Sequence, residues 1–131
     1  GVTGVQTCAL PIYKLNNESL TGVFHCFTGG KKEADHAIEY GGFMLGIGGV
    51  STYKNGGLDL VLPDVSLEHL VLETDSPYLS PVPFRGKRNE SSYVVHVASR
   101  VAEIKGISVE EVADVTTRNA VKMFGLSDEI K

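Results

Sequence analysis

A short apolar run that ends at two carboxylates is the feature that most constrains the fold of this chain. Residues 70–72 read Leu-Val-Leu, and Glu73 and Asp75 follow them before a Ser-Pro turn. The pattern predicts a buried strand over residues 69–74 whose C-terminal end presents residues of a functional site. Continuous apolar runs of this kind are typical of parallel sheets, because both faces of each strand are covered.

Two further strands are expected upstream of this one. Residues 23–27 form an apolar run closed by Thr-Gly-Gly, and residues 43–47 form a second run followed by glycines. Between them, residues 31–40 have the spacing of a helix, with Gly41 as its C-terminal cap. A weak helical or turn segment over residues 55–62 precedes the last strand. This alternation predicts an α/β fold with parallel strands.

Two helices are predicted after the last strand. The first spans about residues 92–105 and ends at Gly106. The second opens at Ser108, where a capping box is formed with Glu111, and it stops at Gly125. Apolar positions that follow the capping box are Val112, Ala113, Ala120, Met123 and Phe124.

Composition narrows the class of protein. The 131 residues suffice for one ordinary domain, and 42% of them are hydrophobic, so a packed core is expected. The net charge of −4 argues against a protein that coats nucleic acid by bulk charge, so any anion site must be local. Two cysteines give no disulfide framework and favour a cytoplasmic setting. No apolar run reaches the length of a membrane span, so no membrane partner is expected.

The first twelve residues fit none of these patterns. They have no clear helical or strand period. They also look like the conceptual translation of a common sequencing adapter. We therefore expect residues 1–12 to be a non-native segment and residues 13–131 to form the domain. The alternative is a genuine, irregular N-terminal segment.

Three candidate site residues fall at the ends of predicted strands: His25, Glu73 and Asp75. The carboxyl ends of parallel strands meet at one edge of a sheet, so His25 and Asp75 could face a common pocket. Imidazole and carboxylate are suitable ligands for Zn²⁺ or Mn²⁺, and Asp75 could also act as general base. Glu73 shares a face with Asp75, and the two charges would repel unless a cation or an arginine lies between them. The alternative reading of His25 is a satisfied core histidine.

The loop after the last strand is strongly basic. Arg85, Lys87, Arg88 and Asn89 are residue types that bind phosphate oxygens, and two prolines stiffen the loop. Composition alone would favour a solvated basic loop. Its position directly after the acidic strand end instead favours contact with a substrate.

Four segments resemble signatures of one family. Residues 23–29 (VFHCFTG) and 70–79 (LVLETDSPYL) resemble two motifs of the TatD-type metal-dependent deoxyribonucleases, and residues 85–90 (RGKRNE) resemble their basic loop. The end of the last predicted helix, up to residue 126, is also similar. The resemblance covers about residues 22–126.

The resemblance implies the C-terminal half of a TIM-type (β/α)₈ barrel of the amidohydrolase kind. It implies a hydrolase that cleaves DNA phosphodiester bonds with two divalent cations, such as Mg²⁺, Mn²⁺ or Zn²⁺. His25 and Asp75 match metal ligands, and Asp75 would also take a proton from the attacking water. Glu73 matches a position that supports the site. Contact of Arg85, Lys87, Arg88 and Asn89 with substrate phosphate is our own inference.

Several parts of the family pattern have no counterpart. The early His-x-His pair, the bridging Glu and a further His would lie upstream of this chain, while Phe84 and Ser91 replace residues common in the family. We therefore expect a truncated fragment that binds metal weakly and is inactive alone. The alternatives are metal-dependent hydrolysis of another ester, an amide or a lactone, and a non-catalytic barrel fragment. Apart from DNA as substrate, no obligate protein partner is inferred.

Overall fold

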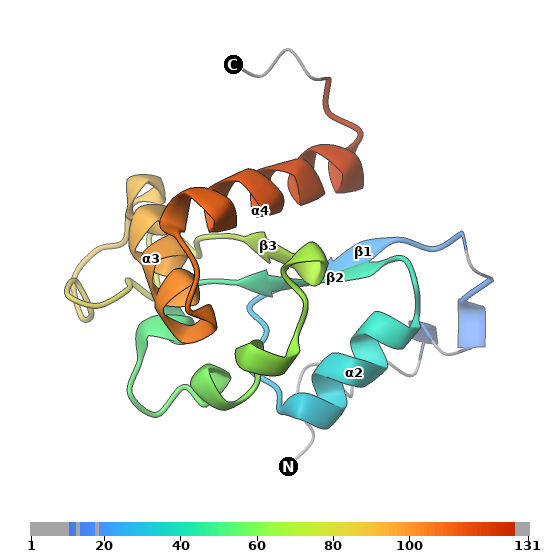
Figure 1. The fold of residues 1–131 in the computed structure, drawn as a ribbon, viewed down its shortest axis with the longest axis horizontal. Coiled ribbons are helices and arrows are strands. Elements are labelled where there is room, and N and C mark those ends of the chain that lie inside the picture. Colours follow the sequence, from blue (N-terminus) through green and yellow to red (C-terminus); the bar gives the residue numbers. More distant parts are fainter. Residues whose placement is uncertain (1–10, 13, 18, 128–131) are drawn as a thin grey trace.

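A three-stranded parallel sheet lies at the centre of the computed structural model, which describes residues 11–12, 14–17 and 19–127. The strands are β1 (Gly22–Phe24), β2 (Phe43–Ile47) and β3 (Leu70–Leu72), in the spatial order β1-β2-β3 (Figure 1). All pairs are parallel, which confirms the predicted α/β arrangement. Because β2 lies between the other two, residues that follow β1 and β3 can meet only across its end.

The predicted helices are present, with ends shifted by no more than two residues. In the described part of the chain the longer helices are α2 (Lys31–Glu39), α3 (Val94–Lys105) and α4 (Val109–Phe124). The segment predicted as a weak helix or turn forms the 3₁₀ turns η2 (Leu58–Leu60) and η3 (Leu62–Asp64). Other 3₁₀ turns are η1 (Gly49–Thr52), η4 (Leu67–His69) and η5 (Ser91–Tyr93). In Figure 1, α4 runs along β3, and α2 lies on the side of β1 and β2.

The helix boundaries follow the predicted capping signals. Ser108 accepts a hydrogen bond at Oγ from the backbone N–H of Glu111, at 3.1 Å, and so caps α4. Gly106 and Gly125 end α3 and α4 with φ values of 67° and 60°, a conformation that costs a glycine little.

One face of the sheet carries the hydrophobic core. Phe24, Leu45 and Leu70 lie side by side in the register of the three strands and pack, with Ile47, under buried positions of the helices. The helix positions in this core are Ala34, Ala37, Val97, Val101 and Val112. The helices therefore hold the sheet from one side, and the strand ends that carry the candidate site are fixed by that packing.

The first strand is shorter than predicted. Strand alternation places Val23, His25 and Phe27 on one face, but β1 ends at Phe24 and Cys26 has a φ of 49°. This bend returns the Phe27 side chain to the core, where it is 1% exposed, and His25 stays outside. The alternation is therefore wrong for Phe27, because the strand ends three residues earlier than predicted.

The buried face of α4 also differs from a simple apolar stripe. Val112 and Val115 are buried together with Thr116 and Asn119, whereas Phe124 is 62% exposed. Polar groups are tolerated in this interface because each finds a backbone carbonyl. Thr116 donates to the carbonyl of Val112 within the helix.

Replacing Asn119 with Ala is expected to destabilise the fold. The Asn119 Nδ2 group donates to the carbonyls of Leu67 and Leu70, at 2.9 and 2.8 Å, and so ties α4 to the start of β3. Loss of the amide leaves buried carbonyls unpaired, so the free energy of unfolding should fall by about 1–3 kcal/mol. Urea denaturation measures it. Thr117→Ala, on the exposed side of the same helix, is the control, and equal stabilities for the two variants would contradict the assignment.

Residues 1–10 of the segment predicted to be non-native lie outside the described residues. Pro11 and Ile12 are described as helical, and Ile12 packs partly buried against the core. In the portion of the chain that the structure covers, no helix has both the length and the apolar character needed to cross a membrane.

Candidate metal centre

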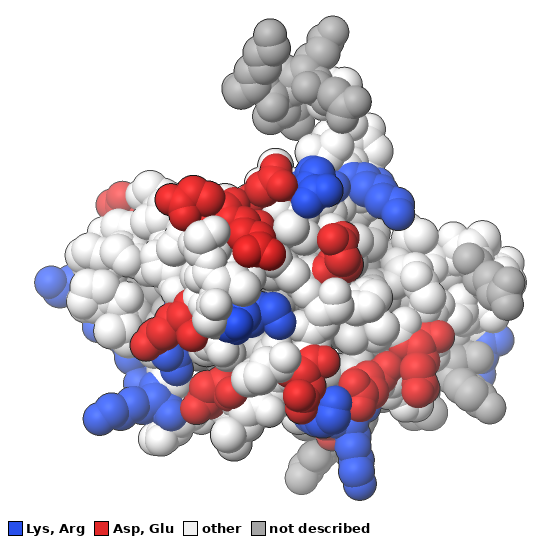
Figure 2. Space-filling view, in the orientation of Figure 1, with Lys and Arg blue, Asp and Glu red and all other residues white. Residues whose placement is uncertain are grey.

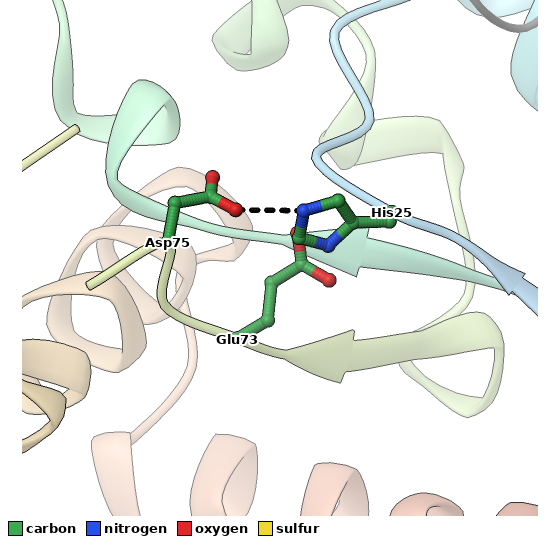
Figure 3. Close-up of side chains that lie close together, drawn as sticks. All are labelled: His25, Glu73 and Asp75. Atoms are coloured by element: carbon green, nitrogen blue, oxygen red, sulfur yellow. Dashed lines mark ion pairs between the residues drawn. The ribbon is translucent and has the colours of Figure 1, made fainter. Parts of the chain in front are cut away.

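Three side chains converge at the carboxyl end of the sheet (Figure 3). His25 follows β1, and Glu73 and Asp75 follow β3, so the group forms across the end of β2. One possible ligand atom from each residue lies within 4.8 Å of the others. The structure thus brings together the three residues that the sequence places at strand ends.

His25 lies between the two carboxylates. Its Nδ1 is 2.9 Å from Oε1 of Glu73, and its Nε2 is 2.7 Å from Oδ1 of Asp75. A cation or an arginine is expected between the two negative charges, and the structure instead places the His25 imidazole there. Both carboxylate side chains are 16% exposed, whereas the His25 side chain is 63% exposed, so the cluster is open to solvent on the histidine side.

The electrostatics of the cluster follow from these contacts. The hydrogen bond that His25 donates to Glu73 raises the pKa of His25. Partial burial opposes this, and the charges of both carboxylates add to it. Burial raises the pKa of the neighbouring Cys26 thiol to about 11, and the charge of Asp75 is the next largest cause of this shift. Cys26 is therefore a neutral thiol at pH 7 and adds no negative charge to the site.

Glu73 is held by a close fit against β2. Its Oε1 accepts a hydrogen bond from the backbone N–H of Cys26. A Cβ atom on Gly46 would lie 2.1 Å from Oε2 of Glu73, so only a glycine leaves room for this carboxylate. The sequence predicts a supporting role for Glu73, and its carboxylate is one of the three groups that could hold a metal ion. The sequence alone does not single out Gly46, because a glycine near the end of a strand is also a common signal that the strand stops.

The donor set fits a divalent cation. Oδ2 of Asp75 is buried and has no hydrogen-bond partner in the described part of the chain. A buried carboxylate oxygen without a donor is costly, and a bound cation would remove that cost. One imidazole nitrogen and two carboxylates are also the ligand types that catalytic zinc and related ions take.

The basic loop presents three cations to solvent. Arg85, Lys87 and Arg88 are all exposed, as contact with a substrate requires. Figure 2 shows acidic and basic side chains interspersed on the face it draws, which agrees with an anion site that is local.

Asn89 differs from the predicted substrate contact. It is 2% exposed, and its Nδ2 donates to the carbonyl of Tyr78 at 2.7 Å. Its Oδ1 accepts from the backbone N–H of Glu90, and its own backbone N–H donates to the carbonyl of Pro77. Asn89 therefore faces the protein and fixes the shape of the loop. Sequence analysis could not separate this role from phosphate binding, because the same amide serves both.

Aromatic packing also shapes the loop. Phe84 stacks on Tyr93, with ring centroids 4.2 Å apart and an interplanar angle of 11°. Ser80 donates from Oγ to the carbonyl of Lys87 and closes the loop on itself. Phe84 therefore anchors the loop to η5, at a position where sequence analysis noted only a departure from the family pattern.

Known proteins resemble this chain in sequence and in fold. The profile of the family described as "TatD related DNase" matches residues 5–125. The "Uncharacterized metal-dependent hydrolase YabD" of Bacillus subtilis is 42% identical over 111 residues, which are 84% of this chain and 43% of that protein. The "3'-5' ssDNA/RNA exonuclease TatD" of Citrobacter rodentium is 38% identical over 112 residues, 80% of this chain and 42% of that protein.

Among solved structures, the TatD homologue YjjV of Escherichia coli superposes with a TM-score of 0.84 at 25% identity. The match covers 94% of this chain and 47% of YjjV. This overlap confirms the predicted fold class, part of a TIM-type barrel. The chain spans about 43% of the length of the curated relatives it matches.

Proposed function

The chain belongs to the family of TatD-related DNases, a family of metal-dependent hydrolases, and on that premise we propose that it serves the hydrolysis of DNA phosphodiester bonds. The observation that carries the proposal is the cluster of His25, Glu73 and Asp75 beside an exposed basic loop. A cluster of this kind suits metal-dependent hydrolysis in general, and the loop supplies the preference for a phosphate-bearing substrate. The name of the Citrobacter relative supports the same substrate class.

The residues of this chain have separate tasks in the proposed reaction. His25, Glu73 and Asp75 would hold a divalent cation, which when bound polarises the phosphoryl group and lowers the pKa of water. Oδ2 of Asp75 would hold the cation, and Oδ1, which faces His25, can take the proton of the attacking water. Arg85, Lys87 and Arg88 neutralise the phosphate charge and orient the backbone of the substrate.

The remaining features of the proposal go beyond these residues. We propose two divalent cations per site, chosen among Mg²⁺, Mn²⁺ and Zn²⁺, in a cytoplasmic enzyme. We also propose that the 131 residues by themselves bind metal weakly and lack turnover, because His25, Glu73 and Asp75 are the only ligand group of three found in the described residues.

Removal of metal tests the function. The product of the complete gene should cleave a 5′-labelled single-stranded oligonucleotide in the presence of Mg²⁺, Mn²⁺ or Zn²⁺. Treatment with a chelator should abolish cleavage, and the same cation should restore it. A panel of aryl esters, amides and lactones is the comparison. Turnover of one of these without cleavage of DNA would overturn the proposed substrate and retain only the hydrolase.

A further inference from the structure

The basic loop is docked closely on η1, the turn that follows β2. A Cβ atom on Gly49 would lie 2.1 Å from the carbonyl oxygen of Leu79, so the two backbones meet without a side chain between them. Thr52 accepts a hydrogen bond at Oγ1 from the backbone N–H of Val82, at 2.9 Å. The start of the loop is thereby fixed to the same strand end over which the metal centre forms.

Tyr53 comes directly after η1 and contacts the loop at two points. Its hydroxyl donates to the carbonyl of Ser80 at 2.8 Å. The guanidinium carbon of Arg85 lies 4.1 Å from the centroid of its ring, a cation–π contact. An exposed arginine otherwise has many rotamers, and this stacking restricts them before any ligand arrives.

Arg85 stays available for an external anion. Arg100 and Arg118 pair with the carboxylates of Glu103 and Asp114, but in the part of the chain that is described no carboxylate forms an ion pair with Arg85. Stacking occupies the face of the guanidinium and leaves the N–H groups at its edge free. Those groups have the fork geometry that binds phosphate oxygens in pairs.

Tyr53 also lies within electrostatic range of the metal centre. Burial raises the pKa of its hydroxyl, the cation of Arg85 lowers it, and the carboxylate of Asp75 raises it further. The ring therefore lies in the field of both the loop cation and a carboxylate of the cluster.

We propose that Tyr53 is a positioning residue that holds the Arg85 guanidinium for a substrate phosphate next to the metal centre. The inference rests on the proposed function and deepens it, because it assigns one phosphate contact to one preorganised arginine. Nothing in the sequence pattern singles out Tyr53, since the contact joins residues 32 positions apart on different loops.

Kinetics on the product of the complete gene test the inference. Tyr53→Leu and Arg85→Gln should each raise KM for a single-stranded oligonucleotide about tenfold and change kcat less, because a contact made in the ground state is lost. Each should reduce the salt slope of oligonucleotide binding by about 1. Tyr53→Phe keeps the ring and should keep most of the affinity. Arg118→Gln, which removes an exposed arginine of α4, is the control and should behave as wild type.

The double variant decides whether the two residues act together. Tyr53→Leu combined with Arg85→Gln should be no weaker than Arg85→Gln alone. Additive losses, or an unchanged KM in Tyr53→Leu, would overturn the inference. If Tyr53→Leu fails to fold, Arg85→Lys serves as the test. Lysine keeps the charge but loses the planar stack on Tyr53. A wild-type KM in Arg85→Lys would therefore also overturn the inference. Absence of cleavage by the wild type would instead remove the proposed function.

Discussion

Replacing Asp75 with Asn is expected to abolish hydrolysis by the product of the complete gene. The substitution preserves the shape of the side chain but removes its charge. The amide nitrogen would face either His25 or the position of the buried Oδ2, and it is neither a ligand for a divalent cation nor a base. Loss of groups that merely orient a ligand costs about 10- to 100-fold in metal affinity or activity, so loss of a ligand should cost more than about 100-fold.

The same substitution should leave stability unchanged or raise it. Asp75 has a buried oxygen without a donor and lies beside the carboxylate of Glu73 at the same strand end. Removing one charge relieves both costs in the metal-free protein, which offsets the weaker contact with Nε2 of His25. A loss of activity without a loss of stability separates a functional residue from a structural one.

Two measurements check this expectation. Calorimetric titration with Mn²⁺ gives the metal affinity, and thermal unfolding in the presence of a chelator gives the stability. Asp114→Asn removes an exposed carboxylate of α4 and is the matched control. Wild-type turnover in Asp75→Asn would exclude Asp75 from both the metal centre and the proton transfer.

The position of this site is predictable because the ends of the strands can be recognised in the sequence. An apolar run that stops at a charged residue marks a strand end, and parallel strands bring such ends together. The sequence therefore predicts that His25 and Asp75 face a common pocket, with Glu73 on the same face as Asp75. The helices were predicted equally well, because Ser108, Gly106 and Gly125 are local signals whose physical effect does not depend on tertiary packing.

The errors concern residues whose role depends on distant partners. Asn89 has the chemistry of a phosphate ligand, but the carbonyls of Pro77 and Tyr78 draw it into the protein. Nothing in the sequence pattern singles out Asn119, which is buried because two carbonyls of the β3 region accept hydrogen bonds from its amide. Phe27 departs from strand alternation because Cys26 bends the chain. Cys26 is the neighbour of Phe27 in the sequence. The carbonyls that bind Asn89 and Asn119 are distant in the sequence from those two residues.

Replacing Gly46 with Ala is expected to disable the metal centre while the fold persists. The added methyl would lie 2.1 Å from Oε2 and 2.8 Å from Cδ of Glu73, and 3.1 Å from a methyl of Val23. The carboxylate is the end of a flexible side chain, so it can move aside. The backbone at Gly46 lies outside the left-handed region and accepts an alanine, so the free energy of unfolding should fall by only about 1 kcal/mol, the lower end for overpacking.

The functional cost should be much larger than the structural one. When the carboxylate moves, Cys26 loses the acceptor of its backbone N–H and His25 loses the partner of its Nδ1. A displacement of about 1 Å at a reacting centre can cost about 100-fold in rate, and we expect hydrolysis to fall by that order. Metal affinity measured by calorimetry should fall with it.

Gly48→Ala is the matched control for this prediction. Gly48 follows β2 and also faces Glu73, but the nearest atom of that residue would lie 3.6 Å from the added methyl, an ordinary contact. Its backbone is extended, with φ −122° and ψ −162°, so alanine is accepted there as well. Gly48→Ala should therefore retain activity close to wild type, although it adds the same methyl two residues away.

A third variant tests whether Gly46→Ala lowers activity by displacing the Glu73 carboxylate. If Gly46→Ala acts through Glu73, then combining it with Glu73→Gln should be no more damaging than Glu73→Gln alone, because the displaced group has already lost its function. Additive losses would mean that the methyl disturbs the packing of β2 against Val23 of β1. Wild-type metal affinity in Gly46→Ala would mean that the Glu73 carboxylate is not needed where the structure places it, and the ligand group would then reduce to His25 and Asp75.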